Sequence, residues 1–123
     1  MSESREYFTK QTEFGAIHIS EDVILSIAAA AVMEVEGVAS LNTAFGAELQ
    51  DRLVKKGTGR GIKLNLDGES LVVECSILVL YGPSMQTVGT SVQDSVRQAV
   101  ESMTGLTVAT VNVHIAGIST KKV

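Results

Sequence analysis

Apolar residues recur at helical spacing in two stretches of the chain. The first begins after Ser20, a residue type suited to a helix N-cap, and ends at Gly37, a residue type common just beyond helices. The second begins after Ser84 and ends before Gly105. Its apolar stripe consists of Met85, Val88, Val92, Val96, Val100 and Met103. We therefore predict two main helices, the first apolar nearly all round and the second amphipathic.

Four other segments alternate between apolar and polar residues, with the period of a β-strand. They cover residues 15–19, 62–66, 71–80 and 107–115. Asp67-Gly68 is a hairpin turn signal between the second and the third, and a short helix is predicted at 47–56. The order β-α-β-β-α-β predicts an α+β fold: a two-layer sandwich with two main helices on one face of a four-stranded sheet. We expect a ferredoxin-like strand order.

The length of 123 residues suits one domain. We place that domain at residues 14–118, between a flexible polar N-terminal tail at 1–13 and a short C-terminal tail at 119–123. The hydrophobic fraction of 45% and the charged fraction of 20% are those of a globular protein. This composition excludes disorder for most of the chain.

Charge and hydropathy exclude two further classes of protein. The net charge of −4 is unlike that of a nucleic-acid-binding domain, which needs clustered basic residues, so we expect no nucleic-acid partner. The longest apolar run, residues 23–33, is shorter than the roughly 20 residues of a membrane-spanning helix. We therefore expect a cytoplasmic protein without a membrane span of its own.

The helix at 21–36 has more apolar surface than a two-layer fold covers. One side suits the sheet, and Leu25, Ala29 and Val32 lie on the opposite side. Exposed apolar patches usually mark contact surfaces. We therefore expect these three residues to bind a second copy or another protein, and a Leu25→Glu change to disperse the assembly without unfolding the domain.

A basic, glycine-rich loop at 55–61 is an alternative site. Its residues Lys55, Lys56, Gly57, Gly59 and Arg60 suit an anionic ligand, because glycines let backbone amides converge and the basic side chains add positive charge. The loop lacks the Gly-Lys-Ser/Thr ending of a phosphate-binding P-loop, and no helix N-terminus follows it. A solvated connector is the other interpretation of the same residues.

Reactive side chains form no recognisable catalytic or metal-binding motif. Cys75, the only cysteine, alternates with apolar residues and is expected to be buried and inert. His18, His114 and Glu74 would share the outer face of a ferredoxin-like sheet, but no metal-ligand spacing supports a site. We expect no enzyme activity, no catalytic residues, no metal and no cofactor.

Several short motifs also occur in a fixed order along the chain. They are Gly15-Ala16-Ile17-His18-Ile19-Ser20, Val23-Ile24 through Ala31 to Glu34-Val35-Glu36-Gly37-Val38, the glycine loop, Val79-Leu80-Tyr81-Gly82, Met103-Thr104-Gly105-Leu106, and Val111-Asn112-Val113-His114-Ile115 with Gly117-Ile118. With this ordered set, residues 15–118 resemble the alkaline shock and general stress protein family of Gram-positive bacteria, also called the envelope stress response family.

The resemblance implies a small cytoplasmic protein without a recognised active site. It implies a role in cell-envelope homeostasis and stress, in which some members self-assemble and some are held at the inner membrane face by a membrane protein. Other members are linked to lipid metabolism. We expect a non-catalytic interaction or scaffold protein that self-associates or docks on a partner. The alternative is a cytosolic regulator that binds an anionic small ligand at 55–61, with a link to lipid metabolism.

Overall fold

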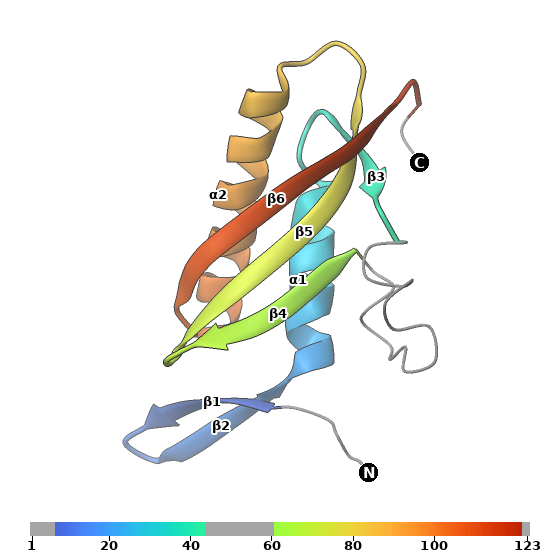
Figure 1. Ribbon diagram of the computed structural model, residues 1–123. Coiled ribbons are helices and arrows are strands. Elements are labelled where there is room, and N and C mark those ends of the chain that lie inside the picture. Colours follow the sequence, from blue (N-terminus) through green and yellow to red (C-terminus); the bar gives the residue numbers. More distant parts are fainter. Residues whose placement is uncertain (1–6, 44–60, 122–123) are drawn as a thin grey trace.

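The computed structural model describes residues 7–43 and 61–121, which form an α+β fold (Figure 1). Its elements in chain order are β1 (Tyr7–Thr12), β2 (Gly15–Ser20), α1 (Glu21–Met33), β3 (Val38–Leu41), β4 (Ile62–Asp67), β5 (Ser70–Leu80), α2 (Met85–Thr104) and β6 (Val108–Ser119). A four-stranded sheet contains β3, β4, β5 and β6, and β1 and β2 form a separate two-stranded sheet. The predicted α+β class is confirmed.

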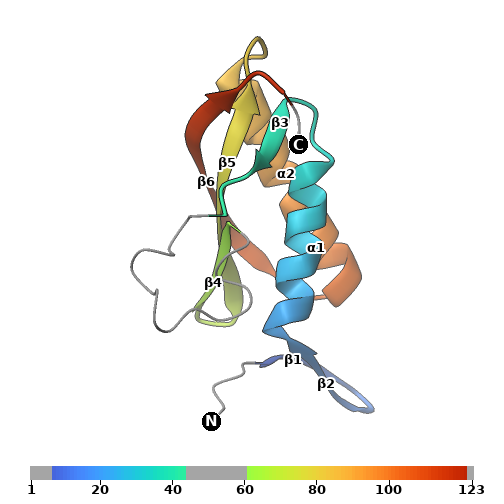
Figure 2. The same ribbon diagram turned by 90° about the vertical axis from the view of Figure 1, so that its right-hand side faces the viewer.

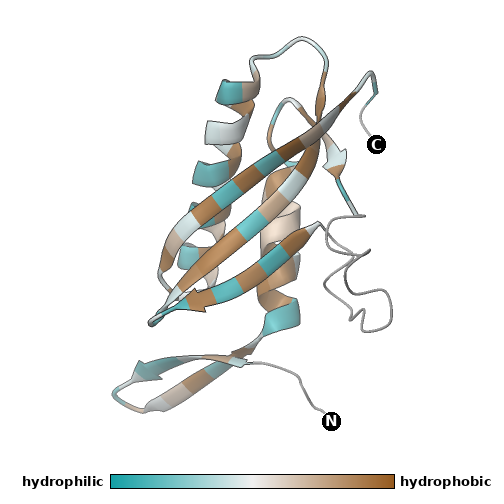
Figure 3. Cartoon of the chain, viewed as in Figure 1, coloured by the Kyte–Doolittle hydropathy of each residue, from teal (hydrophilic) through white to brown (hydrophobic). Residues whose placement is uncertain are grey.

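Both helices cover one face of the four-stranded sheet (Figure 2). Alternate residues of β5 point into the core between the two layers, and Figure 3 shows apolar and polar residues alternating along β4 and β6. The buried residues of β5 on this side are Leu71, Val73, Cys75, Ile77 and Val79. From α2 the predicted stripe supplies Val88, Val92, Val96 and Val100. The two-layer arrangement thus follows from two complementary apolar faces.

The helix ends follow the capping residues. The Ser20 hydroxyl accepts a hydrogen bond from the Val23 amide, and the Ser84 hydroxyl accepts one from the Thr87 amide, each at 3.3 Å. Helix α2 ends at Gly105, which has a left-handed backbone conformation. Helix α1 ends at Met33, a turn earlier than the predicted residue 36, and the chain turns through Gly37 into β3.

Strand β5 is central in the sheet, with β6 parallel to it on one edge. On the other edge β3 and β4 lie end to end, both antiparallel to β5. They meet at Ser76: the Asn42 amide donates to the Ser76 carbonyl, and the Ser76 amide donates to the Gly61 carbonyl, both at 2.8 Å. The chain therefore leaves this edge and returns to it at the same point. The helix predicted at 47–56 lies outside the described residues.

The predicted ferredoxin-like strand order is wrong. The segment 15–19 does not enter the main sheet, because β2 pairs antiparallel with β1 in a separate hairpin. The fourth strand of the main sheet is instead β3. The sequence pattern does not predict it, because four residues are too few to show the period of a strand. The expected flexible tail at 1–13 is also wrong for Tyr7–Thr12, because Phe8 is 5% exposed and anchors the hairpin on the core. At the other end, β6 continues to Ser119.

Candidate interaction surface

The three residues predicted to bind a partner lie mostly inside the domain. Leu25 and Val32 are 3% and 0% exposed and belong to the hydrophobic core, and Ala29 is half-buried against it. The premise that they form an outward face is therefore wrong for Leu25 and Val32. These two side chains contact a partner only if the fold opens.

The second apolar side of α1 is covered by the chain itself. Besides α2, the helix contacts β3 and β4, which lie on the same edge of the sheet, and β2 of the hairpin. A two-layer fold with a helix near the sheet edge covers the helix on more than one side. The side that remains exposed carries Val23, Ser26, Ala30 and Glu34, with Ile27 and Met33 half-buried.

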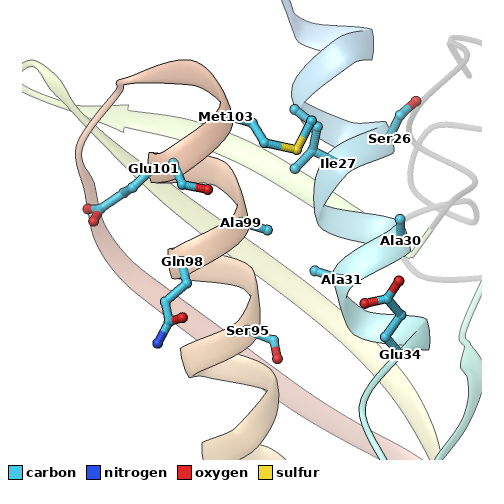
Figure 4. Close-up of a pocket in the computed structure, with 11 residues that line it drawn as sticks. Ser26, Ile27, Ala30, Ala31, Glu34, Ser95, Gln98, Ala99, Glu101 and Met103 are labelled. Atoms are coloured by element: carbon cyan, nitrogen blue, oxygen red, sulfur yellow. The ribbon is translucent and has the colours of Figure 1, made fainter.

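An open groove of about 890 Å³ lies between α1 and α2. Ala31 and Ala99 point toward each other across it, with Ile27 and Met103 at one end (Figure 4). Its lining residues are Ser26, Ile27, Ala30, Ala31, Glu34, Ser95, Gln98, Ala99, Glu101, Ser102 and Met103. Small methyl and hydroxyl groups dominate, and Met103 at the rim is 69% exposed. Such a surface admits close approach of another chain.

The carboxylates of this groove have structural roles or face solvent. Glu101 accepts a hydrogen bond from the Val108 amide at 2.9 Å and pairs with Arg97 at 3.6 Å, so it joins α2 to the start of β6. Glu34 is exposed at the C-terminal end of α1. The lining residues include no histidine, cysteine, lysine or arginine. The polar groups that line the groove are therefore its serine hydroxyls, the Gln98 amide and these two carboxylates.

The expected grouping of His18, His114 and Glu74 is half right. On the outer face of the sheet, His114 Nε2 lies 3.7 Å from Glu74 Oε1. His18 is instead in the hairpin, where its Nδ1 lies 3.0 Å from the Thr9 hydroxyl. Across residues 7–43 and 61–121, no group of three or more histidine, cysteine, aspartate or glutamate side chains is placed to hold a metal ion.

The predicted anion-binding residues Lys55, Lys56, Gly57, Gly59 and Arg60 lie outside the described residues. Within the part of the chain that is described, no helix is long and apolar enough to cross a membrane.

Cys75 is fully buried at the centre of β5, as its alternation predicted. Burial, together with the nearby charge of Glu74, raises the pKa of the thiol from 9.0 to about 12. The reactive thiolate is therefore disfavoured while the domain is folded.

This pKa difference makes stability depend on alkaline pH. Between pH 9 and about 12 the unfolded chain has lost the Cys75 proton and the folded chain keeps it. Folding stability should therefore fall as pH rises through this interval, by up to about 1.4 kcal/mol per pH unit. Urea unfolding below and within the interval should give a steeper loss for the wild type than for Cys75→Ala. Equal slopes would contradict the assignment to this thiol.

Comparison with known proteins places the chain in a family. The family model of alkaline shock protein 23, described by its cell envelope-related function, matches residues 9–120. An uncharacterized protein of Bacillus subtilis (strain 168), YqhY, is 34% identical over 109 residues, which cover 89% of this chain and 81% of that protein. A second B. subtilis protein, YloU, is 30% identical over 112 residues, covering 88% and 92% of the two chains.

A stress response regulator gls24 homolog of Streptococcus pyogenes serotype M3 is 30% identical over 109 residues, covering 88% of this chain and 61% of that protein. No solved structure gives a significant match. The resemblance seen in the sequence motifs is thus confirmed by a match across nearly the whole chain. The chain belongs to the alkaline shock protein 23 family, whose function is related to the cell envelope.

Proposed function

We propose that this protein acts in the response of the cell envelope to stress as a non-catalytic interaction protein. It associates with itself or docks on a partner protein at the cytoplasmic side of the membrane. Family membership supports the envelope role, and the similarity to a stress response regulator supports the link to stress.

One observation carries the interaction role: the exposed side of α1 has no charged residue between Val23 and Met33, and its first charge in the C-terminal direction is Glu34, just beyond the helix. Within this stretch Val23, Ser26 and Ala30 are exposed. A helix face in contact with water ordinarily carries charged and polar side chains. An uncharged stretch beside a groove lined by small side chains suits contact with another protein surface.

Gene deletion with complementation tests this role. A strain lacking the protein should become sensitive to alkaline shift and to antibiotics that act on the cell wall, and the wild-type gene should restore resistance. Ala30→Glu places a charge on the exposed face of α1 and should restore resistance poorly. Ala16→Glu makes the same change at an exposed position of the hairpin and should restore it fully.

Two results would contradict the proposal. The envelope role would be wrong if the deletion strain resisted alkaline shift and cell-wall antibiotics as well as the wild type does. Equal rescue by both alanine variants, at equal protein levels, shows that the outward face of α1 makes no contact needed for function.

A further inference from the structure

Strand β6 is a long edge of the sheet, and among the described residues no second strand covers it, although Glu101 of α2 bonds its Val108 amide and Gln93 its Val111 carbonyl. Within residues 7–43 and 61–121 it pairs with β5 alone, and Figure 1 shows it at the side of the sheet with α2 behind it. Its 12 residues are about twice the mean strand length. They include no lysine, arginine, aspartate, glutamate or proline, which are the residues that usually protect an edge from pairing with another chain.

The middle of β6 is regular and therefore able to accept another strand. Register shifts occur opposite the steps Leu71/Val72 and Ile77/Leu78, and between them Thr110 to Ile115 pair with β5 without interruption. On the helix side of this stretch, Val113 and Ile115 are only half-buried against the core. A strand added at this edge would cover both side chains.

The backbone groups that face outward follow from the register of the strands. The amides of Ser76 and Leu80 donate hydrogen bonds toward the edge formed by β3 and β4. The backbone amide and carbonyl groups of the even-numbered residues of β5 therefore point to that edge, and those of the odd-numbered residues point to β6. Val111, Val113 and Ile115 lie opposite odd-numbered residues of β5. In a parallel ladder such residues direct their own amide and carbonyl groups to the other side.

A side-chain contact agrees with this assignment. The carbonyl oxygen of Val111 accepts a hydrogen bond from Gln93 Nε2 of α2 at 3.0 Å, so it does not point into the β5 ladder. A carbonyl oxygen has a second lone pair, so this contact leaves it able to accept another hydrogen bond. The outward amide and carbonyl groups of Val111, Val113 and Ile115 are the set that a further strand would use.

We propose that the β6 edges of two copies pair antiparallel about a twofold axis at Val113, which joins the two four-stranded sheets into one. This inference rests on the self-association included in the proposed function. The twofold axis sets Val113 opposite Val113 and Val111 opposite Ile115, so the outward backbone groups of each copy meet those of the other.

The side chains of β6 fit a second copy of the same strand. Directly opposed residues of an antiparallel pair share a face, so valine and isoleucine meet on the helix side and Asn112 meets His114 on the outer side. A slip by one residue would set apolar side chains on the polar face. Strand β6 itself has no charged residue, so the pairing sets no like charges of the two strands against each other.

Val113→Pro tests the proposal. The Val113 amide faces outward, so its loss spares the β5 ladder, and edge strands tolerate proline at such positions. Two hydrogen bonds at the axis would be lost together, and the dimer dissociation constant should rise at least about tenfold. Sedimentation velocity over a concentration series measures this, with far-UV circular dichroism to check folding.

Leu64→Pro is the matched control. Leu64 lies on the opposite edge, opposite the odd-numbered residue Val73, and like Val113 it is half-buried against the core. This variant should dimerise as the wild type does. Amide exchange of the wild-type protein is a second measurement, in which Val111, Val113 and Ile115 should gain protection with rising concentration.

The outcomes separate this inference from the proposed function. A wild-type dimer that is unaffected by Val113→Pro, or that gains no amide protection at the three residues, overturns the pairing at β6 and leaves self-association standing. A wild type that stays monomeric at every concentration also overturns the pairing. In that case a defect of Ala30→Glu in cells would still support docking on a partner.

Discussion

Replacing Leu25 with Glu is expected to unfold the domain. Leu25 is 3% exposed and packs in the core where α1 meets the rest of the fold. Loss of a buried leucine costs about 2–5 kcal/mol, and burial of an unpaired carboxylate adds several more. The total is comparable to the roughly 5–15 kcal/mol by which whole domains are stable. Circular dichroism and urea unfolding of the purified variant measure the effect.

Ala30→Glu is the control for this variant. It adds the same carboxylate to the same helix at an exposed position and should change the free energy of unfolding by less than about 1 kcal/mol. A Leu25→Glu protein that remains folded but loses its self-association would restore the interpretation based on the sequence, in which Leu25 contacts a partner.

Gly37→Ala is expected to lower the free energy of unfolding by about 2–5 kcal/mol. Gly37 joins α1 to β3 with φ of +100°, a conformation that side chains rarely adopt. A Cβ atom there would lie 2.5 Å from Val88 Cγ2, inside the packed contact between this turn and α2. Backbone strain of about 1–2 kcal/mol and overpacking of about 1–3 kcal/mol act together. Thermal and urea unfolding should both register the loss.

Two other glycines separate these contributions. Gly68, with φ of +66°, has open space within 4 Å of the position that a Cβ atom would take, so Gly68→Ala should show the backbone cost alone. Gly89 in α2 also has open space, and Gly89→Ala should raise stability by about 0.5–1 kcal/mol because alanine favours helices. If Gly37→Ala were no more harmful than Gly68→Ala, the turn would be able to move away from Val88.

Features with a local cause were predictable from the sequence. The two helices and their caps at Ser20 and Ser84 follow from side chains three residues from the amides they bond. The inner face of β5 and the burial of Cys75 follow from a period of two along one long strand. The ordered motifs also identified the family, because they extend over nearly the whole chain.

The candidate surface was predictable only in part. The apolar residues nearly all round this helix indicated a contact surface, and the helix does have an exposed stretch without charge at Val23, Ser26 and Ala30. The chosen residues Leu25 and Val32 are nevertheless in the core, because the helix contacts β2, β3 and β4 as well as α2. Helical periodicity shows which residues share a side, and it carries no information on which side a distant strand will cover.

The helices, the long central strand, the buried cysteine and the family of this protein could all be predicted from the amino-acid sequence. The hairpin at residues 7–20, the place of β3 at the edge of the main sheet, and the lack of a second strand beside β6 among the described residues became evident only in the folded structure. The two groups of features depend on interactions over different distances along the chain. Capping and periodicity act between neighbours along the chain, whereas strand pairing joins residues far apart, and a four-residue strand such as β3 gains its stability from its partner in the sheet.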